Sequence, residues 1–138
     1  MTLPKAVICD IDGTLALFGD ENPYSRDFMK DIINEPVVNL LNLLKKEHQI
    51  IIFSGRTDKF IQVTMEWLEK HSVPHDELYM RKAKDNRPDN IIKKELYDAY
   101  IKDKYDVMAV FDDRLQVCRL WHDLGLPLFR VGDPEAVF

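Results

Sequence analysis

The sequence is poor in cysteine, has no long apolar run and carries no excess of positive charge. Its two cysteines, Cys9 and Cys118, cannot build a framework of several bridges, and we expect both to be reduced core residues. No run approaches the roughly 18 apolar residues of a membrane span, and residues 1–5 lack the basic and apolar regions of a secretory leader. These absences predict a cytoplasmic protein with no membrane segment.

The balance of charge limits how the chain can contact nucleic acid. It has 19 lysines and arginines against 24 acidic residues, a formal net charge of −5 at pH 7. Proteins that track along nucleic acid present a broad basic surface, because each neutralised phosphate adds to the affinity. We therefore predict no extended nucleic-acid surface, and expect any contact with a strand to be local, as at one of its ends.

Apolar runs and amphipathic segments alternate along the whole chain. Strands are predicted near residues 6–9, 50–53, 78–80, 107–111 and 128–131, with helical patterns at 37–44, 60–68, 92–100 and 117–124. This alternation predicts an α/β fold: a Rossmann-like three-layer domain with a mostly parallel five-stranded sheet. The length fits one domain over residues 1–138. Trp67 and Trp121 fall in helical apolar stripes and are expected to be core residues without a functional role.

Two segments do not follow the alternating pattern. Leu17 to Glu35 carries Gly19, Pro23 and mixed charge, and predicts a flap or small cap, about 17–35, after the first strand. A flap there would overhang the carboxyl end of that strand and exclude water from it. The last residues, Gly132 to Phe138, are expected to be unanchored.

Residues capable of chemistry follow four of the predicted strands. They are the pair Asp10 and Asp12, the turn Ser54-Gly55-Arg56, the basic group from Arg81 to Lys84 followed by Lys93, and the pair Asp112-Asp113. The carboxyl ends of parallel strands share one edge of a sheet, so these groups are expected to meet there. Converging carboxylates repel one another unless a cation is present, and an all-oxygen shell favours Mg²⁺. The sequence therefore predicts a magnesium site that polarises a phosphate oxygen.

The acidic pair of the first strand suggests phosphoryl transfer in two steps. In this hypothesis Asp10 attacks phosphorus and forms an aspartyl-phosphate, while Asp12 donates a proton to the leaving oxygen and later takes one from water. The Ser54 hydroxyl, the Gly55 N–H and a lysine ammonium would meet charge on the transferring group. Asp112-Asp113 is also placed to cap the helix that begins nearby, so one of the two can serve that purpose instead.

These residues resemble the haloacid-dehalogenase-like phosphatase superfamily. Its first motif, a strand followed by Asp-x-Asp-Gly-Thr, is matched at Asp10 to Thr14, its second motif at Ser54, and its acidic fourth motif at Asp112-Asp113. The resemblance implies that Asp10 is the nucleophile and Asp12 the acid/base residue. It also implies that Mg²⁺ is held by Asp10, the Asp12 carbonyl and a carboxylate of Asp112-Asp113, with Asp113 the favoured direct ligand.

A closer resemblance, to the 3′-phosphatase domain of phage polynucleotide kinase/phosphatase, runs through nearly the whole chain. The patterns that carry it are Asp10 to Ala16, Pro23-Tyr24, Asn34 to Val38, Ser54-Gly55-Arg56, Arg87-x-Asp89-x-x-x-Lys93 with Glu95, and Asp112-Asp113-Arg114-x-Gln116-Val117 with Trp121. It implies that Arg56 contacts the substrate phosphate and that Lys93 is the third-motif lysine, with Lys94 as the competing residue. Asp89 would be an active-site acid that helps to hold Lys93. The remaining candidate substrate-binding residues are Thr14, Gly55, Arg81 and Arg114.

The chain departs from that family in two places. The family has an arginine important for activity shortly before the Pro-Tyr pair, where this chain has Glu21-Asn22; Arg26 is the candidate replacement. No Gly-x-x-x-x-Gly-Lys-Ser/Thr loop occurs, so the sequence supports phosphatase activity and no kinase activity. A separate kinase partner domain or a homo-oligomer stays open.

The sequence thus predicts a Mg²⁺-dependent phosphomonoesterase that removes 3′-phosphate from DNA or RNA ends. A nucleotide or small-metabolite phosphatase of the same superfamily is the first alternative. A signalling module that accepts a phosphoryl group on aspartate is the second, and receiver domains of that kind carry their phosphorylated Asp at the end of a later strand. Here Ser54 follows the second strand, and no Asp directly follows residues 78–80.

Overall fold

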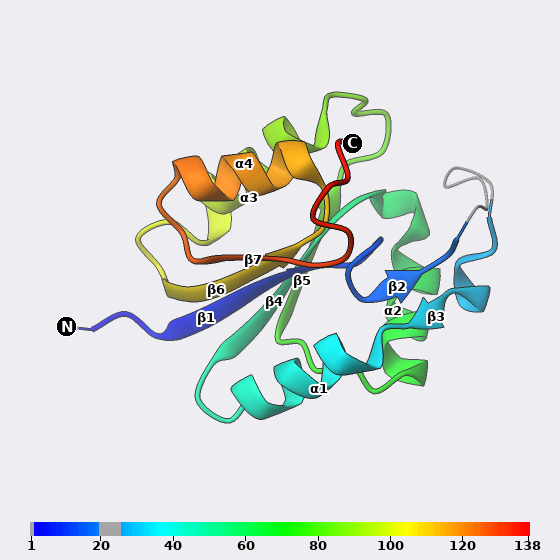
Figure 1. Ribbon diagram of the computed structural model, residues 1–138, viewed down its shortest axis with the longest axis horizontal. Coiled ribbons are helices and arrows are strands. Elements are labelled where there is room, and N and C mark those ends of the chain that lie inside the picture. Colours follow the sequence, from blue (N-terminus) through cyan, green and yellow to red (C-terminus); the bar gives the residue numbers. More distant parts are fainter. Residues whose placement is uncertain (1, 20–25) are drawn as a thin grey trace.

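A five-stranded parallel sheet forms the centre of the computed structural model, which describes residues 2–19 and 26–138 (Figure 1). Its strands are β1 (Lys5–Asp10), β4 (Gln49–Thr57), β5 (Glu77–Arg81), β6 (Asp106–Asp112) and β7 (Leu128–Arg130). They lie in the order β5-β4-β1-β6-β7, and every neighbouring pair is parallel. The predicted α/β fold and its five strands are confirmed.

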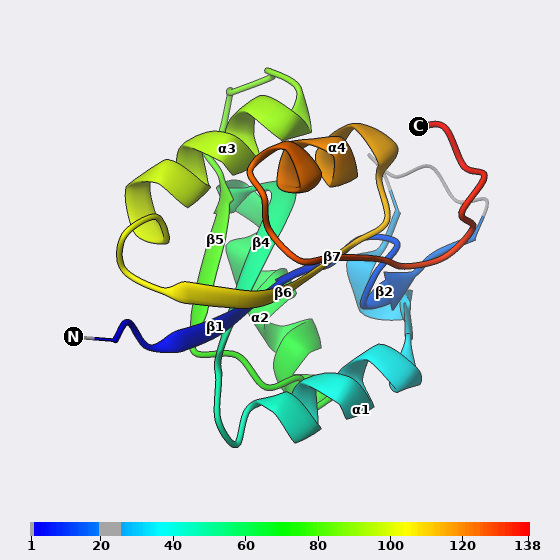
Figure 2. The same ribbon diagram turned by 60° about the vertical axis from the view of Figure 1, so that its left-hand side comes forward.

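Helices cover both faces of the sheet and complete the three layers (Figure 2). They are α1 (Glu35–Leu44), α2 (Ile61–Lys70), α3 (Asp89–Tyr100) and α4 (Leu115–Asp123). The α1 and α2 helices pack on one face and α3 and α4 on the other. Among the described residues, no helix has the length and apolar character needed to cross a bilayer.

The alternation of side chains along β1 explains how the sheet separates the two helical layers. Val7 and Cys9 belong to the cluster that includes Trp67 of α2, whereas Ala6 and Ile8 belong to the cluster that includes Trp121 of α4. Successive side chains of a strand point to opposite faces, so a strand that is apolar throughout must be covered on both. Both tryptophans are fully buried, as predicted.

Both cysteines lie in this core. Cys9 and Cys118 are buried and free, which confirms the expectation of reduced thiols. Burial raises the pKa of the Cys9 thiol well above its usual value, so this thiol stays protonated at neutral pH.

The segment after β1 leaves the sheet and returns through a small antiparallel pair. β2 (Ala16–Leu17) pairs with β3 (Ile32–Ile33), and the 3₁₀ helix η1 (Phe28–Lys30) lies just before β3. Asn34 joins the end of this segment to its beginning. Its backbone N–H donates to Leu15 O, and its side-chain amide donates to Thr14 O. The Pro-Tyr pair and Glu21-Asn22 fall in residues 20–25, outside the described residues, so the flap itself stays a prediction.

The expectation of an unanchored end is wrong. Arg130 at the end of β7 donates to the carbonyl oxygens of Pro134 and Ala136, and the backbone N–H of Leu115 donates to Phe138 O. These contacts fold residues 132–138 back against the start of α4. The sequence gives no sign of this, because a side chain that binds main-chain carbonyls leaves no pattern of apolar residues.

Replacing Arg130 tests this anchor. Arg130→Ala removes donors from two tail carbonyls, so we expect residues 133–138 to exchange amide hydrogens faster and the free energy of unfolding to fall by about 1–2 kcal/mol. Hydrogen exchange and denaturant unfolding measure the two effects. Arg119→Ala, at an exposed position of α4, is the matched control. Equal exchange in both variants would contradict the anchoring role.

Candidate active site

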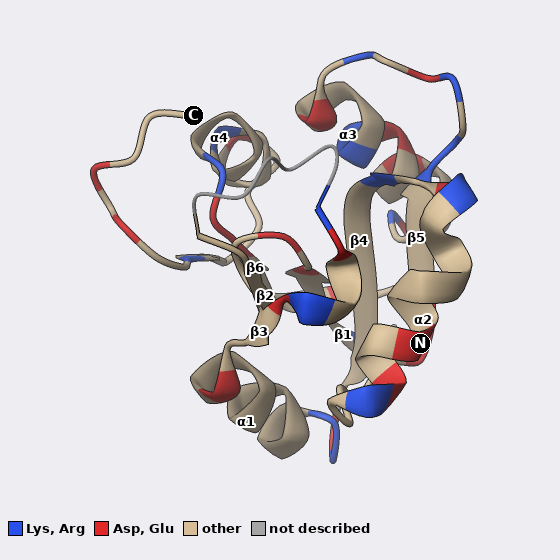
Figure 3. Ribbon diagram, turned by 90° about the vertical axis from the view of Figure 1, so that its right-hand side faces the viewer, with Lys and Arg blue, Asp and Glu red and all other residues tan. Residues whose placement is uncertain are grey.

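The carboxyl ends of the strands meet around one cavity of about 820 Å³. Figure 3 shows where the acidic and basic residues lie along the ribbon, on several elements across the molecule. The cavity is lined by the following residues predicted from the sequence: Asp10, Asp12, Gly55, Arg56, Arg81, Asp89, Lys93, Asp112, Asp113 and Arg114. Thr14 and Ser54 lie buried beside it. The structure therefore brings together every side chain that the strand-end argument selected, apart from the exposed Lys82 and Lys84.

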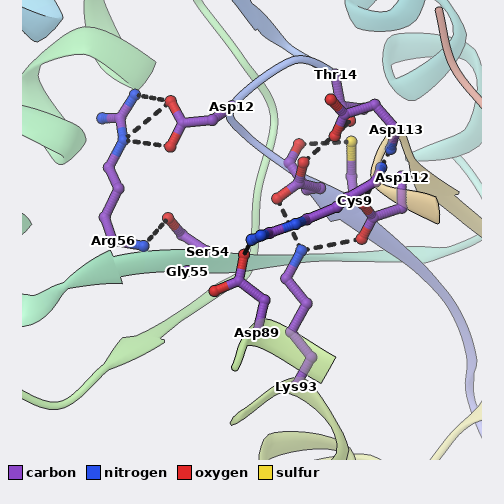
Figure 4. A network of polar contacts seen from close by, with 12 residues as sticks. Cys9, Asp12, Thr14, Ser54, Gly55, Arg56, Asp89, Lys93, Asp112 and Asp113 are labelled. Atoms are coloured by element: carbon purple, nitrogen blue, oxygen red, sulfur yellow. Dashed lines mark hydrogen bonds and ion pairs between the residues drawn. The ribbon is translucent and has the colours of Figure 1, made fainter. Parts of the chain in front are cut away.

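Lys93 reaches from α3 to the ends of two neighbouring strands (Figure 4). Its Nζ lies 2.8 Å from Asp10 Oδ1 on β1 and 2.9 Å from Asp112 Oδ2 on β6. The lysine side chain is only 2% exposed. Lys94, the competing residue, is half exposed and pairs with Asp98 on the outer surface of the helix. The geometry therefore places Lys93, and not Lys94, beside the nucleophile candidate.

Three carboxylates form a compact group of oxygen atoms. One oxygen each of Asp10, Asp112 and Asp113 lie within 4.8 Å of one another. The Thr14 hydroxyl lies 3.1 Å from Asp10 Oδ2 and 3.4 Å from Asp113 Oδ1. When all three carboxylates are ionised they carry three negative charges, and the ammonium of Lys93 compensates one of them. Two negative charges then remain. An oxygen-only set with that charge fits Mg²⁺.

Burial, and after it the neighbouring charges, shift the pKa values of this group. Burial raises the pKa of Asp10 well above its usual value, and the neighbouring Asp112 and Asp113 raise it further against the opposing effect of Lys93. Burial also raises the pKa of Asp113. Burial alone would lower the pKa of Lys93, but Asp10 and Asp112 outweigh it and hold that pKa above its ordinary value. The lysine is therefore a permanent cation, and a divalent ion would favour the ionised carboxylates.

Gly13 allows the two acidic motifs to approach each other. It has φ +83°, and a Cβ at this position would overlap the carboxylate of Asp113. Glycine both adopts the left-handed backbone and leaves the space that Asp113 occupies. The glycine of the first motif therefore determines how close Asp113 lies to Asp10.

Asp112 is held by more partners than the sequence suggested. Its Oδ1 accepts the backbone N–H groups of Asp113 and Arg114, and its Oδ2 accepts both Lys93 and the indole N–H of Trp121 at 3.3 Å. Trp121, expected only to fill the core, thus also orients an acidic residue of the site. Asp112 binds the turn that leads into α4, as a capping residue does, while Asp113 projects toward the oxygen cluster.

Asp12 faces away from this cluster. A register shift in β4 between Ser54 and Thr57 places Gly55 and Arg56 outside the regular ladder with β5, and such bulges redirect side chains. Arg56 Nε lies 3.0 Å from Asp12 Oδ2 and its Nη2 lies 2.7 Å from Asp12 Oδ1. Arg26 also contacts Asp12. The carboxylate of Asp12 is thus held by two guanidinium groups, and it takes no part in the acidic triad.

Sequence reasoning missed the residues that support this arginine pair. Asp31 is buried and accepts Arg26 Nε at 2.9 Å and Arg56 Nη2 at 3.3 Å. The two guanidinium groups stack on the Phe28 ring, 4.7 and 3.9 Å from its centroid. An isolated aspartate and phenylalanine in an irregular segment carry no pattern that could have identified them.

Asp89 does not hold Lys93 directly, contrary to the expectation from the resemblance. Its carboxylate pairs with Arg81, and its Oδ2 accepts Arg114 at 2.6 Å. Burial opposes ionisation of Asp89, but the charges of Lys93, Arg114 and Arg81 hold its pKa below the usual value. Asp89 lies so close to Gly55 that a Cβ there would be 2.6 Å from Oδ1. It is therefore a permanent anion that orients two arginines at the cavity.

The parallel sheet, the Asp-x-Asp-Gly-Thr turn and the lysine between Asp10 and Asp112 together define a haloacid-dehalogenase-like phosphatase. Comparison with known families gives a more specific result. The model described as the polynucleotide kinase PNKP phosphatase domain matches residues 4–135. The chain belongs to this family of phosphatase domains.

Several proteins that resemble this chain are much longer than the part that matches it. The putative bifunctional polynucleotide kinase/RNA ligase of Autographa californica nuclear polyhedrosis virus is 39% identical over 129 residues, 90% of this chain and 19% of the viral protein. A solved structure of the Pnkp1/Rnl/Hen1 complex matches with TM-score 0.91 and 43% identity over 96% of this chain and 48% of its own. A solved structure of the Pnkp1/Rnl/Hen1 RNA repair complex matches with TM-score 0.92 and 42% identity, over 97% of this chain and 44% of its own. The chain thus spans less than half of these relatives.

Enlarging Gly13 tests the close approach of Asp113. We expect Gly13→Ala to displace Asp113 and lower phosphatase activity by about 100-fold or more, since a shift of about 1 Å in a reacting group has an effect of that size. Gly125→Ala is the matched control, because Gly125 has φ +77° but no atom within 4 Å of a Cβ. Steady-state rates and thermal unfolding separate lost activity from backbone strain. Equal losses of activity in both variants would show that strain alone matters.

Proposed function

We propose that this chain removes 3′-phosphate groups from polynucleotide ends, through an aspartyl-phosphate on Asp10 and with the help of Mg²⁺. The observation that carries the proposal is the Asp10 carboxylate fixed between Lys93 and Thr14 at a cavity that also holds an oxygen cluster suited to a divalent cation. Membership of the polynucleotide kinase phosphatase family supports the choice of substrate.

Asp10 is positioned to be the nucleophile. Its two oxygens are bound separately, Oδ1 by the ammonium of Lys93 and Oδ2 by the hydroxyl of Thr14, so the carboxylate has a fixed orientation. A fixed carboxylate in line with the leaving oxygen divides hydrolysis into two easier steps. Lys93 and the hydroxyl of Ser54 would stabilise the charge on the transferring group, as preorganised donors do.

Asp12 is the proton donor and acceptor in this proposal. Its side chain is 29% exposed toward the cavity, whereas that of Asp10 is 8% exposed, so Asp12 can reach a leaving group or a water molecule. Arg56 and Arg26 hold it beside the place where the substrate enters. It would protonate the leaving oxygen in the first step and deprotonate the attacking water in the second.

Asp113 is the carboxylate best placed to hold Mg²⁺ together with Asp10. Both oxygens of Asp112 already accept hydrogen bonds, two from backbone N–H groups and two from the side chains of Lys93 and Trp121. Bound Mg²⁺ supplies charge neutralisation between the carboxylates and polarises a phosphate oxygen. The Asp12 carbonyl remains the proposed third protein ligand.

Contact with the polynucleotide is proposed to be local. Arginines 26, 56, 81, 87 and 114 line one cavity of a chain whose net charge is −5. Such a site can neutralise the few phosphates of a strand end, but it offers no path for a long strand. The larger relatives, one described as a kinase/RNA ligase and others within a repair complex, suggest that a kinase or ligase partner acts with a domain of this kind.

A substrate panel tests the reaction. We expect phosphate release from 3′-phosphorylated oligonucleotides to exceed that from 5′-phosphorylated oligonucleotides, mononucleotides and an aryl phosphate by at least about tenfold in kcat/KM. Asp10→Asn, which removes the nucleophile but keeps the shape, should lower the rate at least about 1,000-fold. Colorimetric phosphate release measures both.

Each alternative has its own outcome in this panel. Preference for mononucleotides or the aryl phosphate would favour a small-molecule phosphatase. A stable phosphorylated aspartate without turnover would favour a signalling module. Full activity of Asp10→Asn would rule out the covalent mechanism. The control for replacing a carboxylate by an amide is Asp98→Asn, on the outer surface of α3.

Removal of the metal tests the oxygen cluster. We expect chelation to abolish activity and added Mg²⁺ to restore it. Asp113→Asn should raise the Mg²⁺ concentration that gives half-maximal rate by about tenfold or more, because one charged ligand becomes neutral. Asp123→Asn, an exposed position of α4, should leave it unchanged. Activity that survives chelation would exclude the proposed cofactor.

A further inference from the structure

One side of the cavity is aromatic. Phe18, Phe28 and Phe60 line it together with the charged residues. Because Arg56 stacks on Phe28 and also binds Asp12, this aromatic group lies on the Asp12 side of the cavity. Phe18 and Phe28 stack on the guanidinium groups that hold Asp12. Phe60 instead contacts Phe28 and Lys59, so this ring points to something else that enters with the phosphate.

The volume of the cavity supports the same idea. A single phosphate group fills only a small part of 820 Å³, and sites of roughly 300–1,000 Å³ take whole ligands of drug size. Asp10, Lys93, Asp112 and Asp113 occupy one part of the cavity wall. The space next to the aromatic side is therefore left for the part of the substrate that carries the phosphate.

Phe60 is the ring best prepared for a planar ligand. It ends the 3₁₀ helix η2 (Asp58–Phe60) and is half-buried at the cavity. Phe28 supports it in an edge-to-face contact with centroids 5.1 Å apart and planes at 72°. The ammonium of Lys59 lies over one face of the ring, 4.9 Å from its centroid, so a base would stack against the other face. A ring fixed in this way loses little conformational freedom when a ligand binds.

We propose that Phe60 stacks against the terminal base of the polynucleotide whose 3′-phosphate reacts at Asp10. The inference rests on the proposed function and makes Phe60 a residue that selects phosphate esters that carry a base over esters without one. Every base has a π-face, so stacking holds the end without regard to sequence. The arginines then contact phosphates while the ring contacts the base.

The test couples a protein change to a substrate change. Wild type and Phe60→Ala are compared on two 3′-phosphorylated oligonucleotides of one sugar type, one with a normal terminal residue and one whose terminal residue is abasic. Stacking on an aromatic ring predicts that Phe60→Ala raises KM for the normal end about fivefold or more and leaves KM for the abasic end within about twofold. The rate constant kcat should change little on either substrate.

Three further proteins separate stacking from packing. Phe60→Leu keeps an apolar side chain without a π-face and should behave as the alanine variant, whereas Phe60→Tyr should retain the wild-type KM. Phe129→Ala, at an exposed position on β7, should leave both KM values unchanged. Thermal unfolding verifies that each variant is folded.

The outcomes are distinct. Equal effects of Phe60→Ala on both substrates, or a normal KM for Phe60→Leu, would overturn the stacking role while leaving the phosphatase proposal intact. Absence of phosphate release from either oligonucleotide by the wild-type protein would overturn the proposed function and this inference together.

Discussion

The ammonium of Lys93 between Asp10 and Asp112 is the interaction on which the rest of the site depends. An ammonium that is 2% exposed is stable only with charged partners, because removal of one partner leaves an uncompensated charge in the protein interior. These partners come from the neighbouring strands β1 and β6, and the lysine comes from a helix on one face of the sheet. Because β1 and β6 are neighbours in the sheet, their carboxylates lie close enough to bind the same ammonium.

Lys93 compensates only part of the negative charge at the site. It neutralises part of the acidic cluster, and Gly13 brings Asp113 into that cluster at a distance that a larger residue would prevent. Carboxylates forced together in this way are costly unless a cation compensates them. These three carboxylates could therefore bind a divalent cation, and Mg²⁺ is the cation proposed for them.

Much of the fold and of the candidate site was accessible from the sequence, for identifiable reasons. Apolar runs locate strand ends, and parallel order brings those ends to one edge, which sufficed to group Asp10 with Asp112. Lys93 required the family resemblance, because nothing local distinguishes a buried helical lysine from a solvated one. The roles of Asp31 and Arg130 were missed. Each depends on polar contacts of a single side chain, and such contacts leave no periodic pattern in the sequence.

The site has two parts. One is held by the sheet and α3, and the other comes from the segment before α1. Asp10, Lys93 and Asp112 lie on strands and a long helix, whereas Arg26 and Phe28 come from the short stretch that β3 and Asn34 tie back to the first motif. Chemistry requires fixed geometry, but substrate choice depends on what surrounds the phosphate. The departure from the family pattern at Glu21-Asn22 would therefore affect substrate recognition, while Asp10, Lys93 and Asp112 keep the positions that the sheet and α3 give them.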